Sequence, residues 1–405
     1  MSNMEDSVVS EGERLVKMST KGQLPILKLL ALSTAGFIAI MTETMPAGLL
    51  PQIGQGLQVS EAMVGQLVTL FAVGSVVAVI PLITATRSWS RKKVLLFAIG
   101  GLFLFDTVTT VSTNYMLTLI ARFIAGMASG LIWGLLAGYA RRMVPDSLQG
   151  RALAIVGVGQ PIALSLGVPL GTWLGSIFDW QIIFGIISAS TLALMLWVLL
   201  ALPDYPGQVS HKKQPLSKVF MIPGIRSVLF VLFVWILAHN ILYTYIAPFM
   251  THTGLDNRLD LSLLIFGVAS VVGVWIIGLL IDNRVRKLTL LSLIVFAIGS
   301  FILGIANEVS ILIYIGITIW GLTFGGAPTL LQKTIGDVAG EEADVAQSMF
   351  VTVFNLAIAG GGVVGGLLLG HVGAGSFPWV LTILSLIGFL TVLKSKSHAF
   401  KPDSR

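Results

Sequence analysis

Three charged side chains lie within long apolar stretches of the sequence: Glu43, Asp106 and Arg122. A charge inside a lipid-spanning helix is costly, so an intramembrane charge is by default a candidate functional group. Two acids and one base leave one acid without a counterion if all three are ionised, and burial favours the neutral form of such an acid. A site that holds one exchangeable proton is what a proton-coupled carrier needs.

Helix rise gives the depth of each charge. Glu43 lies 15 residues after Lys28, which is roughly 22 Å into a hydrocarbon layer about 30 Å thick. By the same rise, Asp106 is roughly 20 Å in, and Arg122 descends roughly 12 Å from the opposite loop. We therefore expect the three charges in one layer, as proton-coupling residues. The alternative is a structural ion pair of Arg122 with Glu43 or Asp106 that only fixes helix packing.

These charges belong to a chain whose composition is that of a membrane protein. Of 405 residues, 55% are hydrophobic and 11% are charged, whereas soluble domains carry about 25% charged residues. The polar N-terminus has no apolar core followed by a cleavage site, so we expect no removable signal peptide. Twelve apolar runs are long enough to span a bilayer, and we expect all of them to be helices. Their limits are 27–50, 62–84, 94–112, 116–140, 151–174, 181–202, 225–250, 261–282, 287–306, 309–331, 345–369 and 377–394.

The loops predict the orientation of the spans. All Lys and Arg residues except Arg122 and Arg258 lie in the two termini or in alternate loops. Because Lys and Arg near the ends of spans stay in the cytoplasm, both termini are expected there. This pattern also accounts for the net charge of +6 without a nucleic-acid partner.

The chain reads as two related halves of six helices. Thr42–Pro46 aligns with Thr244–Pro248, which places Tyr245 opposite Glu43, and glycine patterns of spans 4 and 5 recur in spans 10 and 11. Two parallel repeats predict a substrate site between the halves near the bilayer midplane. The expected parts are a cytoplasmic tail (1–26), two six-helix bundles (27–202 and 225–394), a cytoplasmic linker (203–224) and a second tail (395–405).

Polar side chains in the middle of spans are the candidates for a substrate path. His239 and Tyr243 share one face of span 7, and Asn240 lies on the next. A lone histidine in a membrane helix is more often a hydrogen-bonded packing residue, and that alternative stays open. Weaker candidates are Asn355, Gln160, Trp133 and Trp320.

Several chemistries find no support in the sequence. There is no GxxxxGK[ST] phosphate loop, no HExxH motif and no cysteine. We therefore expect a protein that is not an enzyme and that needs no metal or other cofactor. Its expected partners are a small-molecule substrate, protons and the lipid bilayer. Each chain contains both halves, so it is expected to work as a monomer.

Five short motifs resemble the major facilitator superfamily, in particular its twelve-span drug:proton antiporter branch and the bacterial sugar, arabinose and purine-ribonucleoside efflux proteins within it. The resemblance covers about residues 25–395. The motifs are Thr42-Glu43-x-x-Pro46-x-Gly48-Leu49-Leu50, Arg122 with Gly126, Gly167-Val168-Pro169-Leu170-Gly171, His239-x-x-x-Tyr243-x-Tyr245-Ile246-x-Pro248-Phe249, and Asp344-Val345-Ala346 followed by Phe354-Asn355.

One loop departs from the family pattern. The loop between spans 2 and 3, residues 85–93, lacks the acidic residue that usually precedes its basic cluster. Its counterpart in the second half keeps the pattern. The resemblance implies gating roles for Asp282, Arg286, Lys287, Pro169 and Gly171.

The resemblance implies an all-α integral membrane protein with the major facilitator fold, two pseudo-symmetric bundles of six helices, in a bacterial inner membrane. It also implies a secondary transporter that exports a small solute, such as a sugar, nucleoside or drug, in exchange for protons by alternating access. A proton-coupled importer is the nearest alternative. A membrane sensor or scaffold is a further one, but the short loops offer no output domain.

Overall fold

The computed structural model describes residues 24–86, 88–145, 148–207, 216–281, 284–306 and 309–400, and their regular structure is entirely helical. Twelve helical segments are long and apolar enough to cross a membrane, which confirms the predicted count. The N-terminal tail up to residue 23 and part of the linker, residues 208–215, lie outside the described residues.

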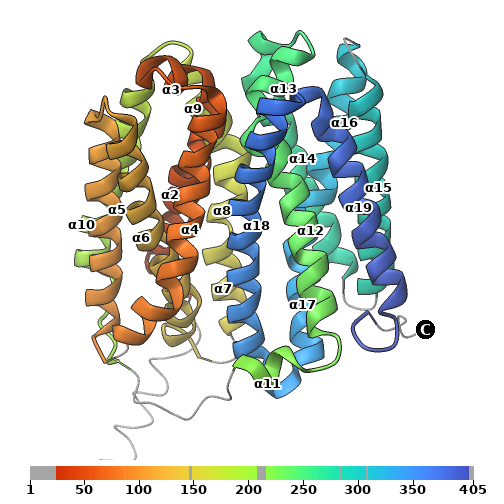
Figure 1. Cartoon of the computed structure of the whole chain (residues 1–405). Helices are drawn as coiled ribbons and strands as arrows, with labels where there is room; N and C mark the ends of the chain where they lie inside the picture. Colours follow the sequence, from red (N-terminus) through yellow and green to blue (C-terminus); the bar gives the residue numbers. More distant parts are fainter. Residues whose placement is uncertain are drawn as a thin grey trace, which may run out of the picture.

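The helices of the first half form one group in Figure 1. They are α2 (Ile26–Gly48), α3 (Leu50–Leu57), α4 (Glu61–Ala85), α5 (Arg91–Val111), α6 (Tyr115–Arg142), α7 (Gln149–Gly157), α8 (Gly159–Ile162), the π-helical turn η2 (Ala163–Gly167), α9 (Val168–Gly175) and α10 (Trp180–Ala201).

The helices of the second half form the other group. They are α11 (Leu216–Phe220), α12 (Ile225–Thr244), α13 (Ile246–His252), η3 (Asp256–Arg258), α14 (Leu259–Leu280), α15 (Val285–Ile305), α16 (Ser310–Gly325), α17 (Ala327–Ala339), η4 (Gly340–Glu342), α18 (Ala343–His371), η5 (Ala374–Ser376) and α19 (Phe377–Lys394). The short helices α3 and α13 lie at one end of the molecule, the α3 end, and α11 lies at the other, the α11 end (Figure 1).

The first span of each half breaks near its α3 end. In the first half, α2 gives way to α3 at Leu49, two residues before Pro51. In the second half, α12 gives way to α13 at Tyr245, three residues before Pro248. Proline removes a backbone donor and crowds the preceding turn, so it weakens the helix on its N-terminal side. The first span of each half is therefore broken, but the two breaks are not at aligned positions of the repeat.

Span 5 is divided by its two prolines. The sequence predicts a bend at Pro161 and Pro169, and the structure has a π-helical turn, η2, between them. Pro169 cannot donate to Ser165, and the preceding N–H of Val168 reaches back five residues to the carbonyl of Ala163. Such π-turns within α-helices often occur at functional sites.

Glycines let span 5 pack closely on α2. A side chain at Gly167, Gly171 or Gly175 would clash with Met41, Met45 or Leu49, respectively. Both sets are spaced by four residues, so one face of span 5 follows one face of α2. This contact fixes how α2, the helix that carries Glu43, is rotated about its own axis.

The two halves meet along two pairs of helices. The helix α4 packs along α18, and α14 packs against η2 and α9. Figure 1 shows α4 and α8 on one side of this boundary and α18 and α12 on the other. Gly267 of α14 fits directly against the backbone of Ser165 in η2. The first-half helix α2 also touches α12, α13 and α14.

The start of the linker is held against the first half at the α11 end. Tyr139 donates its hydroxyl proton to the carbonyl of Pro203 (2.5 Å), and the Lys92 N–H donates to Asp204 Oδ1 (3.2 Å). Asp204 thereby satisfies a free N–H at the first turn of α5, where a negative charge is favourable. Desolvation acts to raise the pKa of Asp204, but the hydrogen bonds that it accepts outweigh this effect and hold the pKa below its usual value.

Candidate functional site

Glu43, Asp106 and Arg122 come from α2, α5 and α6 and meet inside the first half. Asp106 and Arg122 are completely buried, whereas Glu43 keeps 6% of its surface exposed. The guanidinium of Arg122 interacts electrostatically with both carboxyl groups. The structure therefore brings together the three charges that helix rise places in one layer, and it leaves only Glu43 with an accessible surface.

The contacts among the three charges are not a closed ion pair. Arg122 Nη2 donates to the main-chain carbonyl of Glu43 (3.3 Å), and Thr42 Oγ1 donates to Asp106 Oδ2 (2.8 Å). Arg122 Nε and Nη1 and Asp106 Oδ1 are buried without a hydrogen-bond partner among the described residues. Unpaired buried polar atoms are costly, so this site holds donors and an acceptor ready for other partners.

Aromatic rings hold the Arg122 guanidinium in place. Its Cζ lies 4.6 Å from the ring centre of Phe71 on α4 and 5.7 Å from that of Phe184 on α10. Cation–π contacts of this kind stabilise a desolvated guanidinium by up to about 2 kcal/mol. Gly126, one turn further along α6, lies directly against the Phe71 backbone, which brings α4 close enough for the ring contact.

We predict that Thr42→Val destabilises the protein by about 1–3 kcal/mol, because it removes the donor to a buried carboxyl oxygen and leaves that oxygen unsatisfied. Thermal unfolding of the purified protein in detergent measures the change. Thr191→Val is the matched control, since the Thr191 hydroxyl is also buried but donates to the Ile187 carbonyl of its own helix. Equal unfolding temperatures for the two variants would show that the Thr42–Asp106 bond contributes nothing.

His239 lies at the centre of an aromatic cluster in the second half. Its ring stacks on Phe324 (ring centres 3.4 Å apart, planes 7° apart) and lies near Tyr243, Phe266 and Trp320. The indole N–H of Trp320 donates to His239 Nδ1 (3.1 Å). A nitrogen that accepts this bond carries no proton, so the neutral ring has its proton on Nε2. Two predicted substrate residues, His239 and Trp320, are thus hydrogen-bonded to each other.

Tyr243 connects this cluster with the buried charges. It is 2% exposed, and its hydroxyl lies beside the Thr44 side chain of α2. The hydroxyl interacts electrostatically with Glu43, which belongs to the other half. Tyr243 therefore faces the buried charges with one end and the His239 ring with the other.

The other predicted substrate residues make their contacts outside this cluster. The side-chain amides of Asn240 and Asn355 donate to carbonyls of their own helices, those of Ile236 and Val351. Gln160 is half-buried in α8, and half-buried Trp133 packs on Gly36 of α2. Asn355 and Trp133 keep partial exposure, as residues that line a path would.

The predicted gating residues fall into two places. Pro169 and Gly171 lie in α9, where Gly171 packs on Met45, two residues from Glu43. Arg286 lies at the α11 end and donates to the carbonyls of Val392 (2.9 Å) and Phe400 (2.7 Å). Asp282, which the resemblance also gives a gating role, lies outside the described residues.

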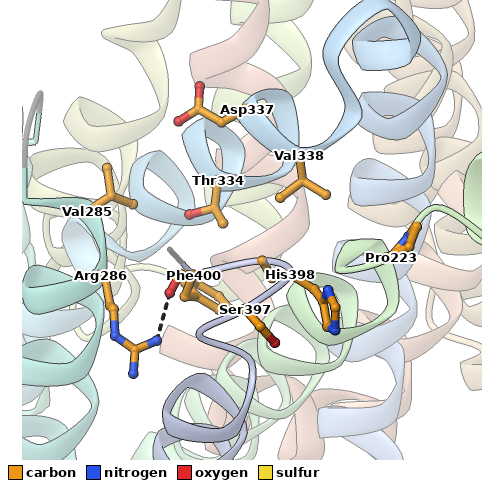
Figure 2. A pocket seen from close by; sticks show the side chains of 10 residues that line it. Pro223, Val285, Arg286, Thr334, Asp337, Val338, Ser397, His398 and Phe400 are labelled. Atoms are coloured by element: carbon orange, nitrogen blue, oxygen red, sulfur yellow. Dashed lines mark hydrogen bonds between the residues drawn. The ribbon is translucent and has the colours of Figure 1, made fainter. Parts of the chain in front are cut away.

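Arg286 anchors the end of the chain. Figure 2 shows its bond to Phe400 at the edge of a cavity of about 400 Å³. Arg286 also donates to the Leu393 carbonyl (3.3 Å), in the last turn of α19, where a cation is favourable. The neighbouring Lys287 has an interaction of its own. The cavity lies within the second half, between α15, α17 and the tail, away from the buried charges.

Sequence reasoning missed the partners of the predicted residues. Thr42 is adjacent to Glu43, but its polarity alone gave no reason to pair it with Asp106. Phe266 and Phe324 are ordinary apolar residues of spans 8 and 10 in the sequence. Gln66, half-buried in α4, reaches the second half by hydrogen bonds to Tyr245 and Gly362. A polar residue inside the apolar run 62–84 was the available signal for it.

Comparisons with known proteins agree with this architecture. The model of the Major Facilitator Superfamily matches residues 32–289 and 263–404. A probable sugar efflux transporter of Helicobacter pylori (strain ATCC 700392 / 26695) is 25% identical over 92% of this chain and 97% of its own length. The purine ribonucleoside efflux pump NepI of Escherichia coli O157:H7 is 29% identical over 88% of this chain and 91% of its own. The crystal structure of the human organic anion transporter MFSD10 (TETRAN) superposes with a TM-score of 0.65 at 15% identity, covering 91% of this chain and 100% of that one.

Proposed function

Because the chain belongs to the Major Facilitator Superfamily and is therefore a multi-pass membrane transporter, we propose that it exports a small solute in exchange for protons. The observation that carries the proposal is the buried group of Glu43, Asp106 and Arg122, which has two acids, one base and unpartnered polar atoms. Such a group can bind and release one proton with little other change.

Glu43 is the proton carrier in this proposal, because it alone of the three has an accessible surface. When Glu43 is ionised, the free nitrogen atoms of Arg122 stabilise its carboxylate. When Glu43 is protonated, Arg122 turns to the unpartnered Oδ1 of Asp106. The two arrangements bias the halves toward different conformations, which is how a proton drives alternating access.

The substrate binds beside Tyr243 in this proposal. The Tyr243 hydroxyl and the proton on His239 Nε2 supply polar groups, and the surrounding rings supply stacking surfaces. Sugars and nucleosides combine hydroxyl groups with flat or apolar faces, and the names of the relatives point to the same classes. Asn240, Asn355, Gln160, Trp133 and Trp320 complete the proposed path.

The α11 end is proposed to face the cytoplasm of a bacterial cell, with both termini and the linker on that side. The support is the distribution of Lys and Arg, which gather in the loops at this end. The bundles 27–202 and 225–394 are proposed to be the two moving units, and the monomer is proposed to be sufficient.

The test is transport by the purified protein in liposomes with an imposed pH gradient. Sugars, purine nucleosides and hydrophobic cationic drugs are supplied one class at a time. We expect one class to move against its gradient while protons move in the opposite direction. Movement of substrate and protons in the same direction would replace export by import. Saturable substrate movement that ignores the pH gradient would remove the proton from the proposal.

A further inference from the structure

We infer that Tyr245, the repeat counterpart of Glu43, latches the two halves together at the α3 end and that its release opens this end of the transporter. Tyr245 separates α12 from α13 and is completely buried. The inference rests on the proposed movement of the halves, but it does not depend on which ion or solute is carried.

Tyr245 makes one hydrogen bond within its own half and further, longer ones across the boundary between the halves. Its hydroxyl lies 2.8 Å from the carbonyl of Gly362 on α18, in the second half, and 3.4 Å from that of Ala62 on α4, in the first half. Gln66 of α4 donates to both the Tyr245 hydroxyl and the Gly362 carbonyl, at 3.4 Å each. Three hydrogen bonds of 3.4 Å therefore join the halves at this point: Tyr245 with Ala62, Gln66 with Tyr245, and Gln66 with Gly362.

Glycines surround the Tyr245 ring and make this contact possible. A Cβ at Gly65 would collide with the Tyr245 hydroxyl, and a Cβ at Gly365 would lie 2.6 Å from the ring. A Cβ at Gly366 would lie 2.7 Å from the hydroxyl. Because the glycines of α4 and α18 bring backbone against both sides of the ring, we expect the halves to separate when the ring leaves.

The aligned position of the repeat, Glu43 in the first half and Tyr245 in the second, thus has a different role in each half. In the first half, Glu43 keeps a small accessible surface and sits beside a buried guanidinium. In the second half, Tyr245 has none and bonds across to α4. Tyr245 lies at the break of the first helix of its half, whereas Glu43 lies six residues before the break at Leu49. A movement of α2 against α12 and α13, which touch it, therefore acts on the latch as well as on the proton site.

The first test measures how often the α3 end opens. The protein has no native cysteine, so Thr69→Cys, at a position 4% exposed beside Gly362, adds a single reporter. Adding Tyr245→Phe keeps the ring and removes the hydroxyl. We expect a membrane-permeant maleimide to label this variant about 2- to 12-fold faster, which is the equilibrium equivalent of one ordinary hydrogen bond.

Tyr139→Phe is the matched control for this test. Tyr139 is 2% exposed, and its hydroxyl also donates to a backbone carbonyl, but it lies at the α11 end within the first half. Its loss should leave labelling at position 69 unchanged. Equal labelling rates in the Tyr245→Phe and Tyr139→Phe proteins would overturn the inference, as would a Tyr245→Phe protein that labels at the rate of the reporter alone.

The second test cross-links α4 and α18 beside Tyr245 with a disulfide. A Cβ at Gly362 would lie 3.2 Å from the Thr69 Cβ, close to the 3.5–4.5 Å of disulfides. We expect the Thr69→Cys/Gly362→Cys protein to lose transport on oxidation and to regain it on reduction, which also shows that the reduced protein is folded. Transport by the oxidised, cross-linked protein at the reduced rate would show that the halves do not part here. This result is distinct from failure of proton coupling, which would leave the effect of the cross-link intact.

Discussion

The Glu43→Gln protein should lose transport against a gradient while it continues to exchange substrate across the membrane. Glutamine has nearly the shape of the neutral acid but cannot release a proton, so the site is fixed in one protonation state. The expected loss of proton-driven transport is on the order of 100-fold, the lower end of the effect of an essential proton-transfer group. Transport of labelled substrate into liposomes with a pH gradient measures the first quantity, and counterflow without a gradient measures the second.

Two variants define what this result means. Glu61→Gln is the control for loss of a glutamate, because Glu61 is half-buried at the start of α4, outside the charged group. It should transport normally. Asp106→Asn tests the other acid of the group, which is completely sealed, and should reduce the rate less than Glu43→Gln does. Substrate-driven proton flux at the wild-type rate in Glu43→Gln liposomes would remove Glu43 from the mechanism.

The fold was largely predictable because lipid imposes simple rules. A helix is the only local structure that satisfies its backbone in a bilayer, so apolar length predicts spans, and the twelve helices of the structure confirm them. The layer shared by Glu43, Asp106 and Arg122 was predictable for a related reason. Helix rise is constant, so sequence distance from a basic loop converts to depth.

The rotation of each helix about its own axis was not predictable, and most of the site depends on it. Depth places Arg122 near Glu43, but only the packing of α2, α5 and α6 shows that its Nη2 bonds to the Glu43 main chain and that two other nitrogens stay unpartnered. Span 7 is buried on nearly all sides, so its sequence pattern does not reveal which residues meet the first half.

The internal repeat was visible in the sequence, but the contacts of its aligned residues were not. The sequence shows that Tyr245 stands where the first half has Glu43. The contacts of Tyr245 with Gln66 and Ala62 join residues 179 and 183 positions apart. Such contacts depend on how two bundles dock, which no local pattern encodes. The asymmetry of the repeat therefore pointed to the right residue without indicating what it does.

Arg122→Ala should stop coupled transport and also destabilise the protein. With the guanidinium removed, no cation remains to stabilise either carboxylate, so Glu43 cannot alternate between its charged and neutral forms. Breaking a buried charge group by removing one partner costs about 3–5 kcal/mol. Thermal unfolding and proton-driven transport measure the two effects. Arg122→Lys keeps the charge but loses the planar fork, and should retain part of both.

A second substitution separates the proposed switch from a structural clamp. If Arg122 serves only to neutralise Asp106, then Arg122→Ala/Asp106→Asn should recover both stability and transport, because the unpaired charge is gone. If Arg122 alternates between the two acids, the double variant should recover stability but not proton-driven transport. The interaction energy from this double-mutant cycle concerns stability alone. The number of protons moved per substrate decides the role of Arg122, and an unchanged ratio in the double variant would establish the clamp.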